Sequence, residues 1–271
     1  MTDTQNKVRE HYNGSGLNDR IQSALDSLDG DRPLTVAALA PLDQFHLRGI
    51  HATAELARAA ALEASDRVLD IGCGIGGPAR YLADTFGCQV AGVDLSPGFI
   101  DAARHLTARC GLSGRVSFHL GDALHLPFAA AVFDVVFLQH VAMNIEDRAA
   151  LYAEVRRVLA PGARFATYDL VLRAGDVVYP TPWARDGSTS FLLTEDQTRT
   201  ALEHAGFRVI RWSDETPAVL EWFSAGAAAP QPGGPSLGAL MGPEFSVMTA
   251  NLARNLREQR LGVFSAVLRR G

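Results

Sequence analysis

The stretch Val68-Leu-Asp-Ile-Gly-Cys-Gly-Ile-Gly-Gly77 joins a short apolar run to a turn that contains four glycines. Residues 68–71 are typical of a buried strand, and the residues after the turn have the spacing of an amphipathic helix. Glycines in such a turn let a ligand approach the backbone closely, and the start of the helix presents unpaired N–H groups. This order predicts a ligand site at the carboxyl end of the strand.

Short apolar runs alternate with helical patterns along the next hundred residues. The predicted strands cover residues 67–71, 88–93, 115–120, 133–138 and 163–171, and the predicted helices between them cover 77–86, 97–110 and 147–159. Residues 133–138 are nearly all apolar, as in a strand that is buried on both faces. Strands separated by helices favour right-handed crossovers, so we predict a doubly wound α/β fold with a mostly parallel sheet.

The segments around this alternating core have a different character. Residues 1–62 contain helical patterns broken by Asn13-Gly14-Ser15-Gly16 and Pro33, with one helix from about 49 to 62. We therefore predict a helical cap or lid, 1–62, and a sheet domain, 63–271, with insertions at about 172–194 and 214–258. Further predicted elements are helices at 195–205 and 244–258, strands at 207–212 and 261–268, and a flexible loop at 225–238.

Composition excludes several classes of protein. Of the 271 residues, 47% are hydrophobic and 20% are charged, and the formal net charge is −5, which is ordinary for a globular protein and offers no electrostatic footprint for nucleic acid or an anionic membrane. No apolar stretch approaches the ~20 residues that span a bilayer, and the polar start of the chain does not resemble a signal peptide. Three cysteines lack metal-ligand spacing. We expect a cytoplasmic protein that binds a small molecule and no metal. The oligomeric state is left open, and swapped N-terminal helices are one way in which the chain could form a homo-oligomer.

Carboxylates follow three of the predicted strands and strengthen the ligand-site hypothesis. Asp70 stands before the first glycine of the turn, Asp94 ends the second strand, and Gly121-Asp122-Ala123 follows the third. The carboxyl ends of parallel strands share one edge of a sheet, and a carboxylate at the end of the second strand can accept both ribose hydroxyls of a nucleoside.

Residues 68–77, Asp94-Leu95 and Gly121-Asp122-Ala123 together resemble the class I S-adenosylmethionine-dependent methyltransferases. The resemblance extends from about residue 45 to 270 and implies a seven-stranded, Rossmann-like sheet that ends in an antiparallel hairpin, formed here by 207–212 and 261–268. It implies S-adenosyl-L-methionine as the cofactor and S-adenosyl-L-homocysteine as the product. The residues implied to hold the methionine part are those of the glycine loop, Gly72, Cys73, Gly74 and Gly76, with Asp70 orienting it. Asp94 would hold the ribose, Leu95 would pack on the adenine, and Asp122 and Ala123 would bind the adenine edge.

A nicotinamide-dependent dehydrogenase also uses a strand, a glycine turn and an acid on the next strand. The Gly-Asp-Ala sequence at 121–123, the acid at position 70 and the terminal hairpin disfavour that alternative. A fold relative that binds the cofactor without catalysis is a second alternative, and the complete glycine loop and ligand acids disfavour it.

A second set of residues resembles the sarcosine and dimethylglycine methyltransferase-like group, which is also similar to phosphoethanolamine and natural-product methyltransferases. These residues are Leu42-Asp-Gln-Phe-His46, Gly49, Ala52-Thr53, 138–144 and 179–183. Such enzymes methylate oxygen, nitrogen or carbon of small molecules, so the resemblance indicates the reaction better than the acceptor. We favour natural-product metabolism, and leave open an osmolyte-type N-methyltransferase and a terpenoid-diphosphate C-methyltransferase.

The resemblance also suggests residues at the reacting centre. Tyr12 precedes the Asn13–Gly16 break, and in relatives a tyrosine here closes over the cofactor and pairs with a histidine after the fourth strand. In this chain Asn144 stands at that histidine's place, where it can orient an acceptor but cannot act as a base. Gln139 and His140 are expected at the methionine end of the cofactor. The unperturbed pKa of histidine, near 6.5, also suits His140 as a general base.

Five further residues complete the predicted site. Gln44 and His46 are expected to reach the cofactor's carboxylate or the acceptor. Asp169 ends the fifth strand, where some related sugar methyltransferases carry a functional acid. Tyr179 and Trp183 are expected to form a wall of the acceptor pocket, with added apolar surface from Trp212, Trp222 and Phe223. An aromatic wall suits either an apolar acceptor or a trimethylammonium-like product held by cation–π contacts.

Overall fold

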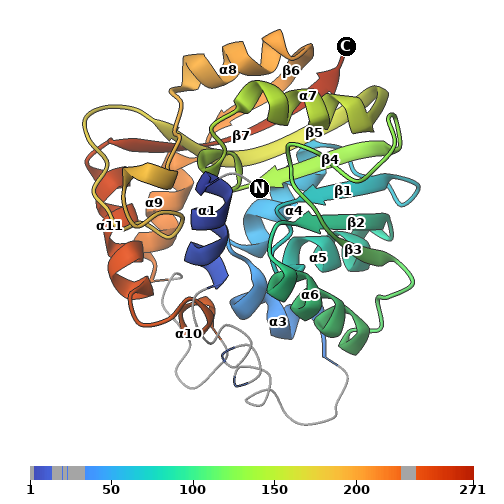
Figure 1. Cartoon of the computed structure of the whole chain (residues 1–271), viewed down its shortest axis with the longest axis horizontal. Helices are drawn as coiled ribbons and strands as arrows, with labels where there is room; N and C mark the ends of the chain where they lie inside the picture. The colour runs from blue at the N-terminus through green and yellow to red at the C-terminus, as the bar shows by residue number, and fades with distance from the viewer. Residues whose placement is uncertain (1–2, 14–19, 21–22, 24–33, 227–235) are drawn as a thin grey trace.

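The sheet at the centre of the protein has seven strands in the order β3-β2-β1-β4-β5-β7-β6 (Figure 1). The computed structural model describes residues 3–13, 20, 23, 34–226 and 236–271. The strands are β1 (Arg67–Ile71), β2 (Gln89–Asp94), β3 (Val116–Leu120), β4 (Phe133–Gln139), β5 (Leu159–Leu172), β6 (Phe207–Asp214) and β7 (Leu261–Arg270). β1 to β5 pair in parallel, and β7 runs antiparallel to both β5 and β6. The predicted fold class and the terminal hairpin are therefore confirmed.

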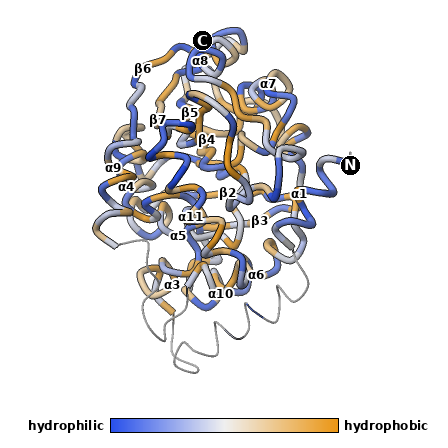
Figure 2. The backbone as a smooth tube through the Cα atoms, turned by 90° about the vertical axis from the view of Figure 1, so that its left-hand side faces the viewer, coloured by the Kyte–Doolittle hydropathy of each residue, from blue (hydrophilic) through white to orange (hydrophobic). Residues whose placement is uncertain are grey.

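Helices cover both faces of the sheet. The helices are α1 (Asp3–Asn13), α3 (Val36–Asp43), α4 (Ile50–Ala59), α5 (Gly77–Phe86), α6 (Pro97–Arg109), α7 (Arg148–Val158), α8 (Glu195–His204), α9 (Thr216–Ser224), α10 (Leu237–Met241) and α11 (Phe245–Arg257). One face packs against α4, α5, α6, α9 and α11, and the other packs against α7 and α8. The hydropathy-coloured trace shows the apolar residues gathered in the inner strands between these layers (Figure 2).

The N-terminal helices do not form one uniform layer. Ala52, Leu56 and Ala57 place α4 in the main core beneath the sheet. Leu39 and Leu42 of α3 belong to a separate apolar cluster with α6 and α10. α1 lies in front of the ends of the central strands (Figure 1). The boundary at residue 62 stays a prediction, and most of the predicted break at 13–16 and of the loop at 225–238 lies outside the described residues.

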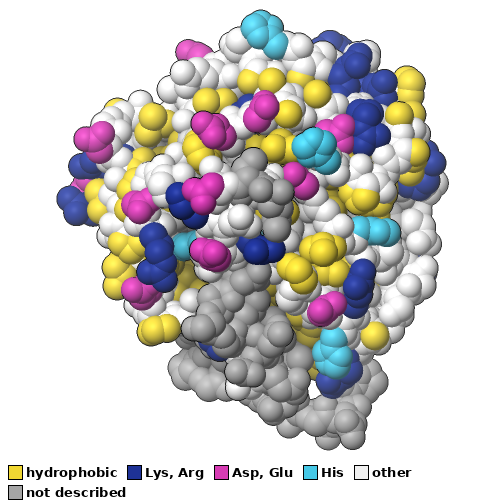
Figure 3. Space-filling view, viewed as in Figure 1, with side chains coloured by type: hydrophobic (Ala, Val, Ile, Leu, Met, Phe, Trp, Pro, Cys, Tyr) yellow, Lys and Arg dark blue, Asp and Glu magenta, His cyan; other side chains and the backbone are white. Residues whose placement is uncertain are grey.

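Two differences from the sequence-based elements have local causes. β5 begins at Leu159, because Leu159 pairs with Phe133 before a shift in register and the strand continues through Pro161-Gly162. α9 was not predicted, although Pro217 in its first turn is a common helix-start signal. None of the described helices is long and apolar enough to cross a membrane. On the face viewed in Figure 3, acidic and basic side chains both occur among the coloured residues.

Candidate active site

A cavity of about 1080 Å³ opens at the carboxyl ends of β1, β2 and β4. Its lining comes from the glycine loop, the segment between α3 and α4, the lid helix α1 and the helices α9 to α11. Ligand pockets usually measure about 300–1,000 Å³, so this cavity has room for more than one small ligand. It lies where open α/β sheets bind their ligands.

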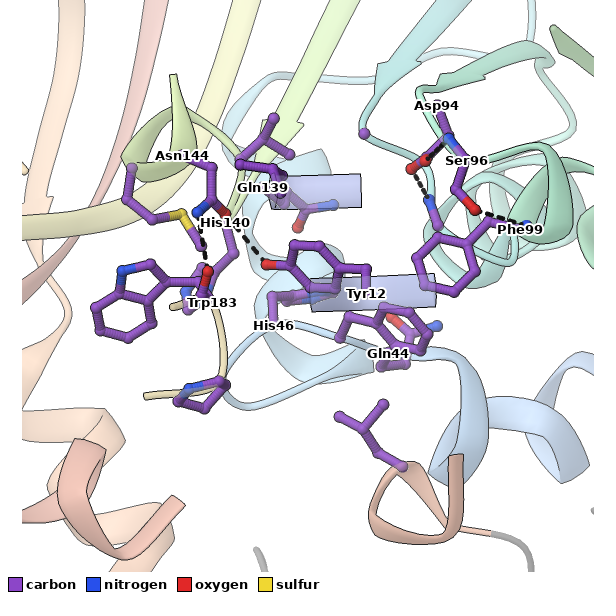
Figure 4. A pocket seen from close by; sticks show the side chains of 18 of the residues that line it. Tyr12, Gln44, His46, Asp94, Ser96, Phe99, Gln139, His140, Asn144 and Trp183 are labelled. Atoms are coloured by element: carbon purple, nitrogen blue, oxygen red, sulfur yellow. Dashed lines mark hydrogen bonds between the residues drawn. The ribbon is translucent and has the colours of Figure 1, made fainter. Parts of the chain in front are cut away.

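The glycine loop is held in place by Asp94 and by close packing. The Asp94 carboxylate accepts from the Gly74 N–H (2.9 Å) and from the Ser96 N–H (2.9 Å) (Figure 4). Gly72 has a φ of +71°, and a Cβ on it would lie 2.3 Å from Val141 Cγ2, so only glycine fits there. Burial raises the pKa of Asp94, and hydrogen bonds from the backbone N–H groups of Ser96, Gly74 and Leu95 partly offset this shift.

Most of the predicted cofactor residues line this cavity. They are Gly72, Gly74, Asp94, Leu95, Asp122, Ala123, Gln139, His140 and Gln44. Asp70, Cys73 and Gly76 lie behind the lining. Asp70 is 2% exposed, and burial, with a smaller contribution from the Asp94 charge, raises its pKa to about 8. Burial also raises the pKa of the Cys73 thiol, as expected for a packed cysteine.

The lid helix α1 is hydrogen-bonded to three separate parts of the site. Gln5 Nε2 donates to Asp122 Oδ2 (2.7 Å), His11 Nε2 lies 2.9 Å from the Pro182 carbonyl, and the Tyr12 hydroxyl donates to Asn144 Oδ1 (3.2 Å). Burial raises the pKa of Tyr12, so its hydroxyl keeps its proton. Tyr12 is thus hydrogen-bonded to Asn144, and α1 forms part of the cavity wall.

Two histidines, His46 and His140, belong to the lining of the cavity. The His140 ring stacks on Tyr168 with ring centroids 5.3 Å apart, and the His46 ring packs edge-on 6.3 Å from it. Burial lowers the pKa of both, for His46 to about 4, and the neighbouring His46 adds to the shift of His140. Both rings are therefore neutral near pH 7, and His140 Nε2 has no partner among the residues described.

Asp169 and Asn144 stabilise the segment that follows β4. The Asp169 carboxylate accepts from the N–H groups of Ala142 and Leu170, both at 2.8 Å, and lies outside the cavity lining. Asn144 Nδ2 donates to the carbonyls of Trp183 (2.9 Å) and Thr189 (2.8 Å). The structure thus gives Asp169 backbone partners rather than direct access to the cavity.

The other half of the cavity is apolar. Trp183 is 1% exposed and anchored by its Nε1 donating to Ser190 Oγ (3.0 Å), whereas Tyr179 lies outside the lining. The sequence did not identify α10 and α11 as cavity walls. Side chains of this apolar half are Met143, Trp183, Trp222, Phe223, Met241, Phe245 and Leu252. Trp212 instead stacks on Phe264 at 4.3 Å, with Arg199 over its ring.

Among the residues that the structure describes, no group of three or more His, Cys, Asp or Glu side chains could hold a metal ion. Arg48, a cationic residue of the lining, is paired with Glu55 (2.7 Å) and Glu215 (3.2 Å).

Comparison with known proteins supports the class that the fold and the glycine loop indicate. Residues 69–167 match the family model described as a methyltransferase domain. The methyltransferase GfsG of Streptomyces halstedii is 38% identical over 132 residues, which are 49% of this chain and 48% of that protein. The O-methyltransferase resE of Aspergillus sclerotiorum is 31% identical over 167 residues, 60% of this chain and 62% of that protein. The chain thus spans about half to three fifths of the length of these relatives.

Solved structures extend the similarity to the whole chain. Geranyl diphosphate C-methyltransferase from Streptomyces coelicolor A3(2) gives a TM-score of 0.72 at 20% identity, covering 100% of this chain and 99% of that one. Phosphoethanolamine N-methyltransferase 2 of Haemonchus contortus gives 0.71 at 20% identity, covering 97% and 60%. The [4+2]-cyclase SpnF gives 0.67 at 20% identity, covering 100% and 97%. These values establish the fold, and with the match at 69–167 they confirm the resemblance to class I S-adenosylmethionine-dependent methyltransferases.

Proposed function

We propose that this protein transfers the methyl group of S-adenosyl-L-methionine to oxygen, nitrogen or carbon of a small apolar molecule in natural-product metabolism. The observation that carries the proposal is the composition of the cavity. The lining includes the glycine loop with Asp94 and Asp122, and it also includes aromatic and aliphatic side chains of α9, α10 and α11. A methyl donor and an apolar acceptor need these two environments side by side.

The residues of the polar half fit the cofactor. Gln44 Oε1, Gln139 Nε2 and His140 Nε2 are buried and lack a partner among the described residues, and all three belong to the cavity lining. Buried polar groups without partners are rare and point to a missing ligand. We assign Asp94 to the ribose hydroxyls, Leu95 to the adenine face, and Asp122 with the Ala123 N–H to the adenine edge.

Methyl transfer from a sulfonium is an in-line displacement, and the bound cofactor supplies the activated methyl group. The chain must align the acceptor, exclude water and remove a proton where the acceptor carries one. α1 excludes water through its three hydrogen bonds, and Tyr12 fixes the lid against Asn144. We assign His140 Nε2 as the proton acceptor because it belongs to the lining and has no partner among the described residues. Burial lowers the pKa of His140, which leaves the ring unprotonated near pH 7 and makes it a weaker base than a free imidazole. Asp169 holds the segment that carries Asn144.

The apolar half favours an apolar acceptor over the other candidates. Trp183 and Asn144 remain our candidates for acceptor contacts, with Trp222 and Phe223 of α9. Arg48 is already paired with two carboxylates, which disfavours it as a partner for a diphosphate. A cytoplasmic location and the absence of nucleic-acid or membrane partners stay predictions based on the composition and charge of the chain. Assembly into a homo-oligomer through swapped N-terminal helices also stays open.

The test is formation of S-adenosyl-L-homocysteine with three sets of acceptors. These are hydroxylated aromatic polyketides and macrolides, then sarcosine and dimethylglycine, and then a prenyl diphosphate with Mg²⁺. We expect turnover with the first set only. Turnover with the amines would make the aromatic residues a cation cage, and turnover with the diphosphate would make the protein a terpenoid C-methyltransferase. Cofactor binding with no turnover on any acceptor would contradict the proposed activity.

A further inference from the structure

The side-chain amides of two glutamines belong to the cavity lining. In each amide one end is hydrogen-bonded, and the other end has no partner among the described residues. Gln44 follows α3 and Gln139 ends β4, and each is 7% exposed. The atoms without a partner are opposite in kind, because Gln44 leaves its carbonyl oxygen and Gln139 leaves its NH2 group. Figure 4 shows both side chains around the same cavity. The cavity therefore offers an acceptor and a donor that its own walls do not satisfy.

Asp43 determines which end of Gln44 faces the cavity. The Asp43 and Arg80 side chains are both 0% exposed and pair at 2.8 Å. Arg80 is held in turn by the Thr107 hydroxyl (3.0 Å) and the Ala103 carbonyl (3.3 Å). A carboxylate paired with arginine can only accept a hydrogen bond. Gln44 must therefore direct Nε2 to Asp43 Oδ1 (3.0 Å), which leaves Oε1 for the cavity.

A chain of hydrogen bonds that begins at Gly49 determines the orientation of Gln139. The Gly49 carbonyl can only accept, so His46 Nε2, 2.9 Å away, carries a proton. The same nitrogen lies 2.9 Å from Thr53 Oγ1, and because this nitrogen carries a proton the Thr53 hydroxyl cannot donate to it. The Thr53 proton then goes to Gln139 Oε1 at 3.1 Å. Gln139 is left with its NH2 group directed to the cavity.

We infer that Asp43 and Thr53 are positioning residues that fix the opposite orientations of the two amides. Gln44 then binds the ammonium of the methyl donor's amino-acid end, not the carboxylate that the sequence suggested, and Gln139 binds the carboxylate. This inference rests on the proposed function. An α-amino acid end carries one group of each kind, and a fixed acceptor beside a fixed donor matches it without reorganisation. Neither positioning residue belongs to the cavity lining.

Thr53→Val tests the Gln139 half, because valine keeps the shape of threonine and removes the hydroxyl. The probes are S-adenosyl-L-homocysteine and its decarboxylated analogue, titrated calorimetrically into the full chain. We expect the affinity for S-adenosyl-L-homocysteine to fall about tenfold, as for one hydrogen bond to a charged group, and the affinity for the analogue to change less than about twofold. The matched control is Thr198→Val, which removes another buried hydroxyl, donated to the Thr194 carbonyl in α8, and leaves both affinities unchanged.

The Gln44 half is tested with the double variant Asp43→Leu/Arg80→Met. A single substitution would leave a buried charge unpaired, whereas replacing both partners with apolar residues is tolerated in other proteins. We expect a loss of about fivefold to tenfold for S-adenosyl-L-homocysteine and little change for its deaminated analogue. Gln44→Leu removes the acceptor itself, and we expect the same difference in affinity between the two ligands. This variant replaces the double variant if the latter does not fold.

The outcomes separate this inference from the proposed function. Equal losses for the complete ligand and its analogues would show that Thr53 and Asp43 act on the fold alone, and would overturn the inference. Unchanged affinity of Thr53→Val for S-adenosyl-L-homocysteine would overturn it as well. If the wild-type chain does not bind S-adenosyl-L-homocysteine at all, the proposed function fails first and this inference fails with it.

Discussion

Asp94 holds the glycine loop in the structure and, in our proposal, also binds the ribose of the ligand. Its carboxylate already accepts from the N–H groups of Gly74 and Ser96. We expect Asp94→Ala to weaken binding of S-adenosyl-L-homocysteine by about 2–3 kcal/mol, roughly 30-fold to 150-fold, because bonds between a charged group and the ribose are lost. Asp94→Asn keeps an acceptor for one N–H and should weaken this binding less. Calorimetric titration measures both, and unchanged affinity in Asp94→Ala would refute this placement of the ribose.

Asp70 makes the stability of the ligand-free protein depend on pH. Its folded-state pKa is raised to about 8, so between roughly pH 4 and pH 8 the folded state binds one proton more than the unfolded chain. This contribution is complete below the unfolded pKa and is lost as the pH rises through 8. In Asp70→Asn the loss disappears, so the variant's stability relative to wild type should improve by about 3 kcal/mol between pH 5.5 and pH 8.5. Urea unfolding at both pH values measures this, and an equal difference at the two would contradict it.

The sequence could not predict the contacts of some individual site residues. The sequence suggested Asp169 as a functional acid at the end of β5. In the structure β5 continues to Leu172, backbone N–H groups of Ala142 and Leu170 occupy the Asp169 carboxylate, and Asp169 lies outside the cavity lining. The distance between Tyr12 and Asn144 likewise depends on how α1 docks, which no local pattern encodes. The roles of the site residues themselves stay predictions until they are measured.

We expect α1, which lines the cavity, to act as its lid. Its three hydrogen bonds join it to the loop after β3, the segment after β4 and the Pro182 region. A short helix of this kind opens locally at a small cost in free energy, well below that of global unfolding. Loss of one contact should therefore increase the open fraction without unfolding the sheet.

Tyr12→Phe tests this property of the lid. The substitution removes the hydrogen bond to Asn144 and keeps the ring, which packs edge-on against Phe99. With a net value of about 1 kcal/mol for the bond, amide exchange in residues 3–13 should accelerate about fivefold, while exchange in β4 stays unchanged. Tyr152→Phe is the control, because Tyr152 is a buried tyrosine outside the cavity lining. Exchange at the wild-type rate would show that the Tyr12 hydroxyl does not hold the lid.

The alternating core was predictable because each strand and helix between 67 and 158 has its own strong local pattern. α5 was predicted with its observed bounds, and β4 within one residue. α9 and α10 were not, since they follow no regular alternation and their positions depend on packing against α11 and α3. These are the elements that supply much of the apolar half of the cavity, so the acceptor side was the less predictable side.

The fold class followed from the sequence, because parallel strands joined by helices have few allowed topologies. The strand order β3-β2-β1-β4-β5-β7-β6 was not predicted and comes from the structure. The sequence did not reveal that the glycine loop and the apolar side chains of α9 to α11 line one cavity, since that depends on how α1 and α9 to α11 pack against the sheet. The central claim is that this cavity binds the methyl donor at the glycine loop.

The most direct test is calorimetric titration of the full wild-type chain with S-adenosyl-L-homocysteine, and separately with NADH. Both ligands carry an adenosine with a ribose diol, so Asp94 alone does not distinguish them. We predict saturable binding of one S-adenosyl-L-homocysteine per chain and none of NADH. Binding of NADH, or no binding of S-adenosyl-L-homocysteine, would contradict the account.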